Sequence, residues 1–310
     1  MLKIHRTYQF VRRIRLNSSP MPSNPAPPLD RLSALLDRFR VRAHLFHAGA
    51  LCGLTHFDAQ PGRAFMHVLR RGEMVLTHPP GSGAPPKIAV SEPTLLFYPR
   101  PLAHQFSNAP SEGSDFVCAT LDFEGGERHP LVAALPPVLV LPLRSVEGLE
   151  PTLALLFAET ERLRCGQRLL ADRLFEVLLL QLLRWLLEHP EQAGMQAGLI
   201  HGLAHPKLAH ALTAMHEAPG AAWSLESMAL AAGMSRSAFA AEFKQQLGST
   251  PADYLLQWRV SVARSMLLGG ASIKSAGEAL GYASAASFSR AFALASGLAP
   301  RAWLEQQRQA

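Results

Sequence analysis

The sequence predicts a multi-domain α+β protein, with a β-barrel and its attached helices followed by an all-α domain. Its 310 residues correspond to about two domains rather than one small core. Between residues 44 and 141, short apolar runs alternate with Gly and Pro clusters, which is typical of an antiparallel sandwich or barrel. From residue 151 onward, apolar residues recur at helical spacing.

Composition and charge limit the classes of protein to which the chain can belong. Apolar residues make up 48% of the chain and charged residues 17%, which favours packed interiors over disorder. The formal net charge is +6, but residues 1–20 alone contain five basic side chains and no acid. We therefore take the overall basicity as weak evidence for a nucleic-acid partner, and we expect residues 1–28 to be a disordered basic arm or an upstream extension.

The cysteines and the apolar runs exclude two further classes. Cys52, Cys118 and Cys165 are odd in number and far apart, which argues against a disulfide framework and a structural zinc cluster and favours the cytoplasm. The richest apolar run, residues 169–187, is interrupted by charged residues. It predicts a buried helix rather than a membrane span.

Residues 29–150 are expected to form the β-domain, and residues 151–189 two helices. A first helix is predicted over residues 29–40, and the strands follow. The second of these helices is apolar nearly all round, so it must be covered on more than one face. A partner subunit would cover the second face and give a homodimer; the alternative is that one chain covers both faces.

Residues 190–205 are rich in Gly, Ala, Gln and His and predict a linker. A new helical domain is expected from Pro206, since proline suits the first position of a helix.

The last hundred residues contain a weak internal repeat. Gly233 matches Gly281, and after each of these glycines a Phe-x-x-x-Phe pair, a glycine and a proline recur in the same order. The paired residues are Phe239, Phe243, Gly248 and Pro251 in the first copy and Phe288, Phe292, Gly297 and Pro300 in the second.

Each copy has the pattern of a helix-turn-helix, over residues 224–247 and 272–296. A serine can cap the first helix, a glycine permits the sharp turn, and a second serine begins the next helix. A long helix over residues 251–268 joins the copies. Seven helices are expected from residue 206 to the end.

These motifs resemble the DNA-binding domain of the AraC/XylS family of bacterial transcription regulators. The resemblance rests on AAGMSRSAFAAEFKQQLGSTPADYL, the Trp258-Arg259 pair and GYASAASFSRAFALASGLAPRAWL, and it covers residues 206–304. The preceding β-region with its helices is similar to the cupin-type sensor domain found in one branch of this family.

The resemblance implies that the second helix of each motif enters the major groove of double-stranded DNA. Arg290 is the best candidate for reading a base, because arginine pairs bidentately with guanine; the alternative is an ion pair with a neighbouring acid. Arg236, Lys244, Arg259 and Lys274 are expected to contact phosphates. The remaining candidate contacts are Ser237, Ala240, Ala241, Ala285, Ala286 and Ser289.

The chain departs from the family pattern at Ala241, Glu242 and Ala293, where many relatives look more basic. We therefore expect weaker intrinsic affinity, a shallower salt dependence and more reliance on dimerisation. Two motifs in tandem on one chain predict direct-repeat half-sites rather than a palindrome within one subunit.

The barrel is expected to bind a small-molecule effector, in a pocket lined by Phe65, His67, Phe97 and His104. Two histidines and Glu73 could instead form a metal-binding facial triad, although the His-x-His pair of metal cupins is missing. The third interpretation is that His67 and His104 are structural and hydrogen-bonded inside the barrel. Other histidines without ligand spacing are His47, His56 and His78.

The sequence thus predicts a cytoplasmic, nucleoid-associated transcription regulator without catalytic residues, bound metal or cofactor and without a membrane partner. RNA polymerase is a candidate partner. The alternative is a metal-dependent cupin enzyme with a regulatory DNA-binding tail.

Overall fold

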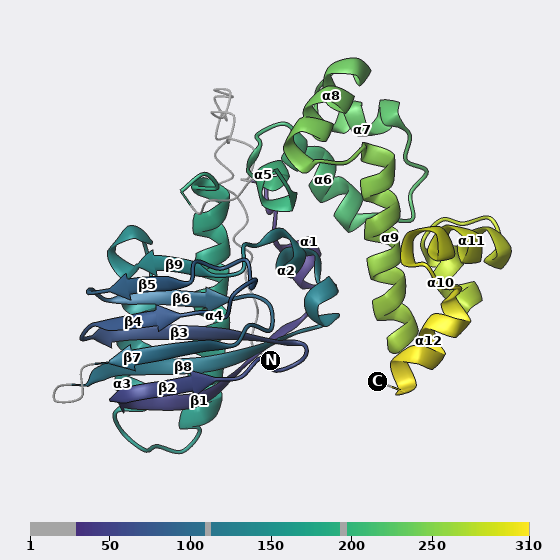
Figure 1. Ribbon diagram of the computed structural model, residues 1–310. Helices are drawn as coiled ribbons and strands as arrows, with labels where there is room; N and C mark the ends of the chain where they lie inside the picture. The colour runs from purple at the N-terminus through teal and green to yellow at the C-terminus, as the bar shows by residue number, and fades with distance from the viewer. Residues whose placement is uncertain (1–28, 109–112, 193–196, 310) are drawn as a thin grey trace, which may run out of the picture.

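The computed structural model describes residues 29–108, 113–192 and 197–309. The predicted basic arm lies outside these residues. Figure 1 shows a two-layer β-domain on one side and a helical domain on the other, with the short helices α1 (Ser33–Leu36) and α2 (Pro130–Ala134) between them. No helix in the described ranges is long and apolar enough to cross a membrane.

Within residues 29–108 and 113–192, nine strands form the β-domain and pair antiparallel in two sheets. One sheet has the order β1-β8-β3-β6-β9 and the other β2-β7-β4-β5. The strands are β1 (Val41–Leu51), β2 (Gly53–Phe57), β3 (Arg63–Arg71), β4 (Met74–Thr77), β5 (Lys87–Val90), β6 (Thr94–Tyr98), β7 (His104–Asn108), β8 (Ser114–Phe123) and β9 (Leu139–Pro142).

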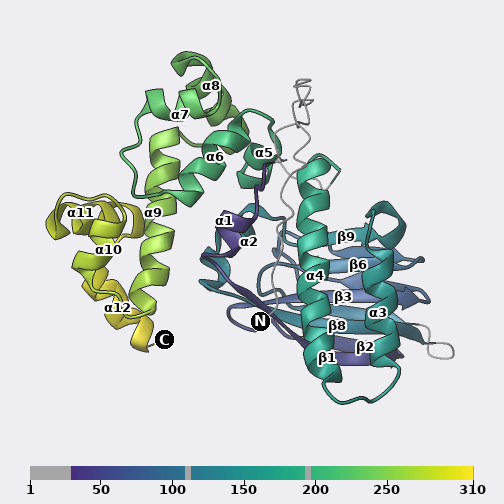
Figure 2. The same cartoon turned by 180° about the vertical axis from the view of Figure 1, so that it is seen from behind.

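Strands β3, β6 and β8 of the five-stranded sheet are buried on both faces, which explains their nearly continuous apolar sequences. Alternate residues of β3 point to opposite sides. Phe65 and Leu69 belong to the apolar cluster between the sheets, whereas Met66 and Val68 pack in a second cluster against the helices. These helices are α3 (Glu150–Thr160) and α4 (Gln167–Glu188), which cover the outer face in Figure 2.

The helical domain begins with α5 (Leu199–Ala204) and continues through seven further helices. They are α6 (Leu208–Glu217), α7 (Leu225–Ala231), α8 (Arg236–Leu247), α9 (Pro251–Leu268), α10 (Ile273–Ala279), α11 (Ala285–Ser296) and α12 (Pro300–Gln309). Figure 1 shows α9 as the central rod, with α7 and α8 near its start and α10 to α12 around its second half. The bounds of α9 match the sequence prediction.

Two sequence predictions are wrong in detail. The helix expected over residues 29–40 shrinks to α1 (Ser33–Leu36), since the chain turns into β1 at Val41. The expected linker over residues 190–205 contains α5, because its Leu199, Ile200 and Leu203 are buried. The apolar residues of this segment are the sequence signal that indicates a packed helix rather than a linker.

The two domains are packed together through the α1 segment. The Phe39 ring lies edge-on to Trp258 of α9 with centroids 5.4 Å apart, and to His129 at 5.5 Å. Arg38 donates hydrogen bonds to the carbonyl oxygens of His216 and Glu217 at the end of α6. His129 caps α2 (Pro130–Ala134), so α1, α2 and the first helices of the second domain form one continuous core.

Candidate DNA interface and barrel pocket

The first motif, α7 and α8, is built as the repeat predicts. Ser224 caps α7 through the Ser227 amide, and Ser235 caps α8 through the Ala238 amide. Gly233 has φ of 61°, a left-handed conformation that a side chain would strain, and it makes the turn between the helices. Burial of Phe239 and Phe243 then fixes which face of α8 points outward.

The second motif, α10 and α11, has the same caps and the same turn as the first. Ser272 and Ser284 cap the two helices, and Gly281 has φ of 78° in the turn. Phe288 and Phe292 are buried. The predicted capping, turns and buried pairs are therefore confirmed in both copies.

The outward faces of α8 and α11 carry most of the candidate DNA contacts. Arg290 is exposed and forms no ion pair with any described residue, so the alternative of a neighbouring acid finds no support. Lys274 lies 3.9 Å from Glu278 in an exposed pair. Ala240 and Ser289 are half-buried; the exposed candidates are Arg236, Ser237, Ala241, Lys244, Ala285 and Ala286.

Arg259 has a different environment from the phosphate contact expected for it. Its guanidinium donates hydrogen bonds to the carbonyl oxygens of Pro219 and Ala221, at 2.7 and 2.9 Å, and lies over the Tyr282 ring. These contacts join the α6–α7 loop to the second motif. Because two of its donors are used inside the protein, we leave Arg259 out of the proposed DNA contacts.

A close backbone contact accompanies Arg259 at this junction. A Cβ atom built on Gly220 would lie 2.3 Å from the carbonyl oxygen of Ala279, and one on Gly281 would lie 2.2 Å from that of Gly220. The two loops therefore touch through their main chains. Gly220 could not be singled out from the sequence, since a glycine in a short Pro-Gly loop already has a local explanation.

The barrel interior holds a hydrogen-bonded pair of neutral histidines. His104 Nδ1 lies 2.8 Å from the Leu102 carbonyl oxygen, so Nδ1 donates and Nε2 is free to accept. His67 Nε2 lies 3.0 Å from His104 Nε2 and must be the donor. Burial lowers the pKa of His104 to about 4 and that of His67 well below its usual value, so both rings are uncharged near neutrality.

An aromatic row continues from this pair. The Tyr98 ring stacks on His104 with centroids 3.9 Å apart, and its hydroxyl donates to His78 Nε2 at 3.0 Å. The pKa of Tyr98 is raised by burial. Each polar group of the row has a hydrogen-bond partner within the row or on the backbone, apart from His67 Nδ1, which has none among the described residues.

One predicted pocket residue is wrong. Phe97 does not face the interior of the barrel; it packs in the cluster under the helices, near Phe123. Its neighbours Leu96 and Tyr98 face inward, because side chains alternate along β6. Phe65 and His104 each line a cavity, and His67 lies behind them.

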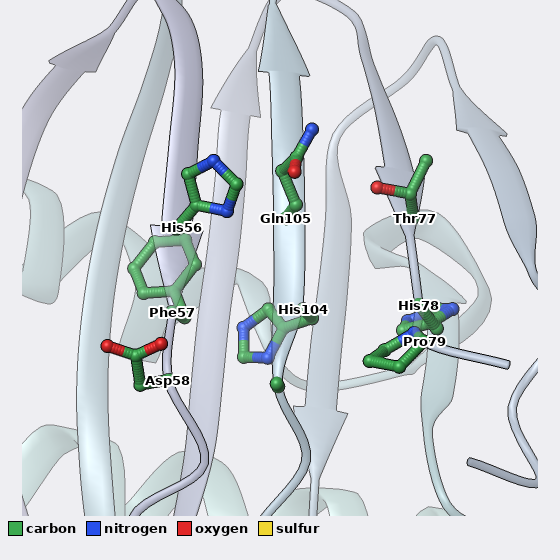
Figure 3. Close-up of a pocket in the computed structure, with 9 residues that line it drawn as sticks. His56, Phe57, Asp58, Thr77, His78, Pro79, His104 and Gln105 are labelled. Atoms are coloured by element: carbon green, nitrogen blue, oxygen red, sulfur yellow. The ribbon is translucent and has the colours of Figure 1, made fainter. Parts of the chain in front are cut away.

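The cavities open at one end of the barrel. One has a volume of about 280 Å³ and is lined by His104, His78 and Gln105, as Figure 3 shows. The other has a volume of about 570 Å³ and is lined by Phe65 and Arg63, among others. Both cavities share His56, Phe57 and Asp58 of the β2 end. Of these shared residues, only His56 had been singled out.

The facial triad considered for a metal does not form. Glu73 is exposed, whereas His67 and His104 are buried. Among the residues that the structure describes, no group of three His, Cys, Asp or Glu side chains could hold a metal ion.

Comparison with known proteins agrees with this architecture. A family model described as "Cupin" matches residues 30–188, and one described as "Helix-turn-helix domain" matches residues 228–306. A putative AraC-like transcription regulator from Streptomyces antibioticus is 30% identical over 299 residues, covering 88% of this chain and 97% of that protein. The chain belongs to the AraC family of transcription regulators.

Other relatives have the same character. The RCS-specific transcriptional activator RclR of Escherichia coli K12 is 30% identical over 249 residues, covering 78% of this chain and 84% of that protein. Among solved structures, an AraC-type regulator from Chromobacterium violaceum is 32% identical, covering 34% of this chain and 94% of that one, with a TM-score of 0.31. This AraC-family chain thus joins a cupin domain to a helix-turn-helix domain.

Proposed function

We propose that this AraC-family regulator binds promoter DNA through both motifs and responds to a small molecule bound in its cupin domain. The observation that best supports DNA binding is the pair of serine-capped motifs on one central helix, each with cationic side chains on its outward face that form no ion pair with any described residue. In the first motif these cations are Arg236 and Lys244, and in the second the cation is Arg290.

The roles of the cations differ. Arg290 is the base-reading residue, and Arg236, Lys244 and Lys274 contact phosphates. The half-sites lie in direct repeat, about 34 Å apart along one face of the duplex. The alanines of α11 supply apolar contacts to thymine methyl groups rather than hydrogen bonds.

A gel-shift assay on fragments selected from the host genome tests this proposal. Arg290→Ala should weaken binding to the selected site by about 1–3 kcal/mol while leaving nonspecific binding nearly unchanged. Lys244→Ala should weaken binding to all sequences and reduce the salt slope by about one. Arg301→Ala, on the exposed side of α12, is the matched control. Equal losses for Arg290→Ala and Arg301→Ala would contradict the assignment.

The effector binds at the open end of the barrel, next to the shared residues His56, Phe57 and Asp58. The two adjoining cavities, which share the end of β2, support this site. A polar small molecule could form hydrogen bonds there with His56, Asp58 and Gln105 and could pack against the Phe57 ring. The effector regulates by favouring one arrangement of the two domains over another.

The active form is a homodimer held by α3 and α4. One face of α4 packs on the sheet, but the opposite face carries an exposed apolar stripe. The stripe consists of Leu169, Leu170, Val177 and Leu180. A second copy would cover this stripe.

We further propose that the protein acts in the cytoplasm, on the nucleoid, with RNA polymerase as an additional partner. We propose a regulator rather than an enzyme. Elemental analysis of protein purified without added metal separates the two: stoichiometric iron or zinc that is lost on replacing His67 would favour a cupin enzyme with a DNA-binding tail.

A further inference from the structure

The outward face of α11 carries a large apolar side chain that the fold leaves in solvent. Leu294 is 80% exposed, whereas the core contacts of the same helix come from Phe288 and Phe292. Single exposed leucines occur on many protein surfaces, so exposure by itself assigns no role to this one. Its position on α11 is what sets it apart.

Helical geometry places Leu294 beside Arg290. Residues four apart lie about 40° apart around a helix and about 6 Å apart along it, so their side chains share one side. Arg290 lies opposite the buried Phe288 and Phe292, at the centre of the outward face. In Figure 1, α11 lies on the side of α9 away from the barrel. Leu294 therefore belongs to the face that the proposed function directs into the major groove, one turn beyond the arginine.

The side chains around Leu294 on this helix are apolar rather than ionic. The sequence of α11, AASFSRAFALAS, contains Arg290 and no other charged residue. Its repeat partner α8 differs at this point, because Lys244 and Gln245 stand where α11 has Ala293 and Leu294, at the same offset as the Phe pairs. Beyond its arginine, α11 thus offers a partner only apolar contact, whereas α8 offers polar groups.

Thymine is the base that suits such a side chain. Its C5 methyl is the apolar group of the major groove, and proteins contact it with apolar side chains, while the other base edges are recognised through hydrogen bonds. Leucine supplies no hydrogen bond. A polar base edge covered by it would lose its water without a replacement, at a cost in free energy. A methyl group against leucine instead removes apolar surface from water on both partners.

We propose that Leu294 is a specificity-determining residue that contacts the methyl group of a thymine in the second half-site. This thymine lies within about two base pairs of the guanine read by Arg290, since about 6 Å along α11 equals about two base-pair steps of 3.4 Å. The first half-site has no such requirement at the matching position, where α8 has Gln245. The inference rests on the proposed function and adds what the second half-site must contain.

Deoxyuridine is the probe, because it pairs with adenine as thymine does and lacks only the methyl group. Gel shifts with the full chain compare the selected promoter fragment with copies in which one thymine of the second half-site, on either strand, is replaced. One replacement should weaken wild-type binding about fourfold, the equivalent of ~0.8 kcal/mol for one buried methyl-sized group. The guanine is located by 7-deazaguanine, which removes the N7 acceptor and should weaken binding of the wild type but not of Arg290→Ala.

Variants assign the methyl contact to the leucine. Leu294→Ala should bind the unmodified fragment about fourfold more weakly and should lose the deoxyuridine effect, so the two changes are not additive. Leu294→Gln, which copies the first motif at Gln245, should likewise be insensitive to the methyl group. Leu230→Ala is the matched control, since Leu230 is 79% exposed on α7 and lies outside both recognition helices. It should bind both DNAs as the wild type does.

Three results would overturn the proposal. They are the absence of any deoxyuridine effect within about two base pairs of the guanine, an effect as large in Leu294→Ala as in the wild type, and undiminished binding of Leu294→Ala to the unmodified fragment. If this variant keeps full DNA binding but lowers transcription by purified RNA polymerase, the leucine contacts a protein partner instead. Specific binding of the wild type to the unmodified fragment tests the proposed function separately, so that function stands if the thymine contact fails.

Discussion

The contact between Gly220 and Ala279 offers the sharpest test of how the two motifs are held together. Gly220 needs no left-handed conformation, so replacing it with alanine tests space alone. The new Cβ would lie 2.3 Å from the Ala279 carbonyl oxygen, whereas ordinary van der Waals contact begins at 3.4 Å. The two loops must therefore separate by about 1 Å, and the hydrogen bonds of Arg259 span the same gap.

Overpacking of this kind costs about 1–3 kcal/mol. For a domain of about 100 residues, each kcal/mol lowers the unfolding temperature by about 4–8 °C. We expect Gly220→Ala to lower the unfolding temperature of the helical domain accordingly. We also expect weaker binding to DNA that carries both half-sites, because the second motif is displaced relative to the first, with less effect on a single half-site.

The matched control is Gly269→Ala at the end of α9. Its new Cβ would meet only the carbonyl oxygens of Met266 and Ser265 at 3.4 Å, with φ of −73°. Calorimetry and gel shifts on both variants decide the question. If Gly220→Ala unfolds at the same temperature as Gly269→Ala and binds two half-sites equally well, the junction does not set the geometry of the motifs.

Three further predictions follow from burial. His129 and His216 have their pKa values lowered by burial to about 4 and about 3, so the unfolded state binds more protons below pH 6.5. Stability should therefore fall by about 1.4 kcal/mol per pH unit for each of them as the pH drops from 6.5 toward 4, and equal urea midpoints at pH 7.5 and 5.5 would contradict this. Phe39→Ala should cost about 3–5 kcal/mol and split unfolding into two transitions, whereas Phe46→Ala, at a side chain 45% exposed, should leave a single profile. Leu180→Glu should convert a dimer into a monomer in sedimentation, and a wild-type monomer at micromolar concentration would refute the dimer itself.

The helical domain was largely predictable from the sequence, because its signals are local. A capping serine, a turn glycine and a Phe pair four residues apart each act within one or two turns of helix. Their repetition at a constant offset gave the positions of α8 and α11. The role of Arg259 was not local: its acceptors lie about 40 residues earlier in the chain, and no spacing rule connects them.

The barrel was predictable as a class and less so in detail. Glycine and proline clusters show where the strands begin and end, but the face of the sheet to which each side chain points depends on the strand register. Phe97 illustrates this, since β6 is buried on both faces and its apolar run shows no alternation from which an inward side could be chosen. The cavities at the barrel's open end combine strand ends from both sheets, and only the fold brings these together.

The two outward helices are alike in shape and unlike in side chains, since α8 bears Arg236 and Lys244 where α11 bears Ala285 and Ala293. A DNA-binding domain with two different recognition helices binds its site in one direction along the duplex. If the binding site were inverted in the DNA, the bound protein would be reversed along the duplex. A different side of the protein would then face RNA polymerase at the neighbouring promoter. Site orientation, and not only site sequence, should therefore matter to output.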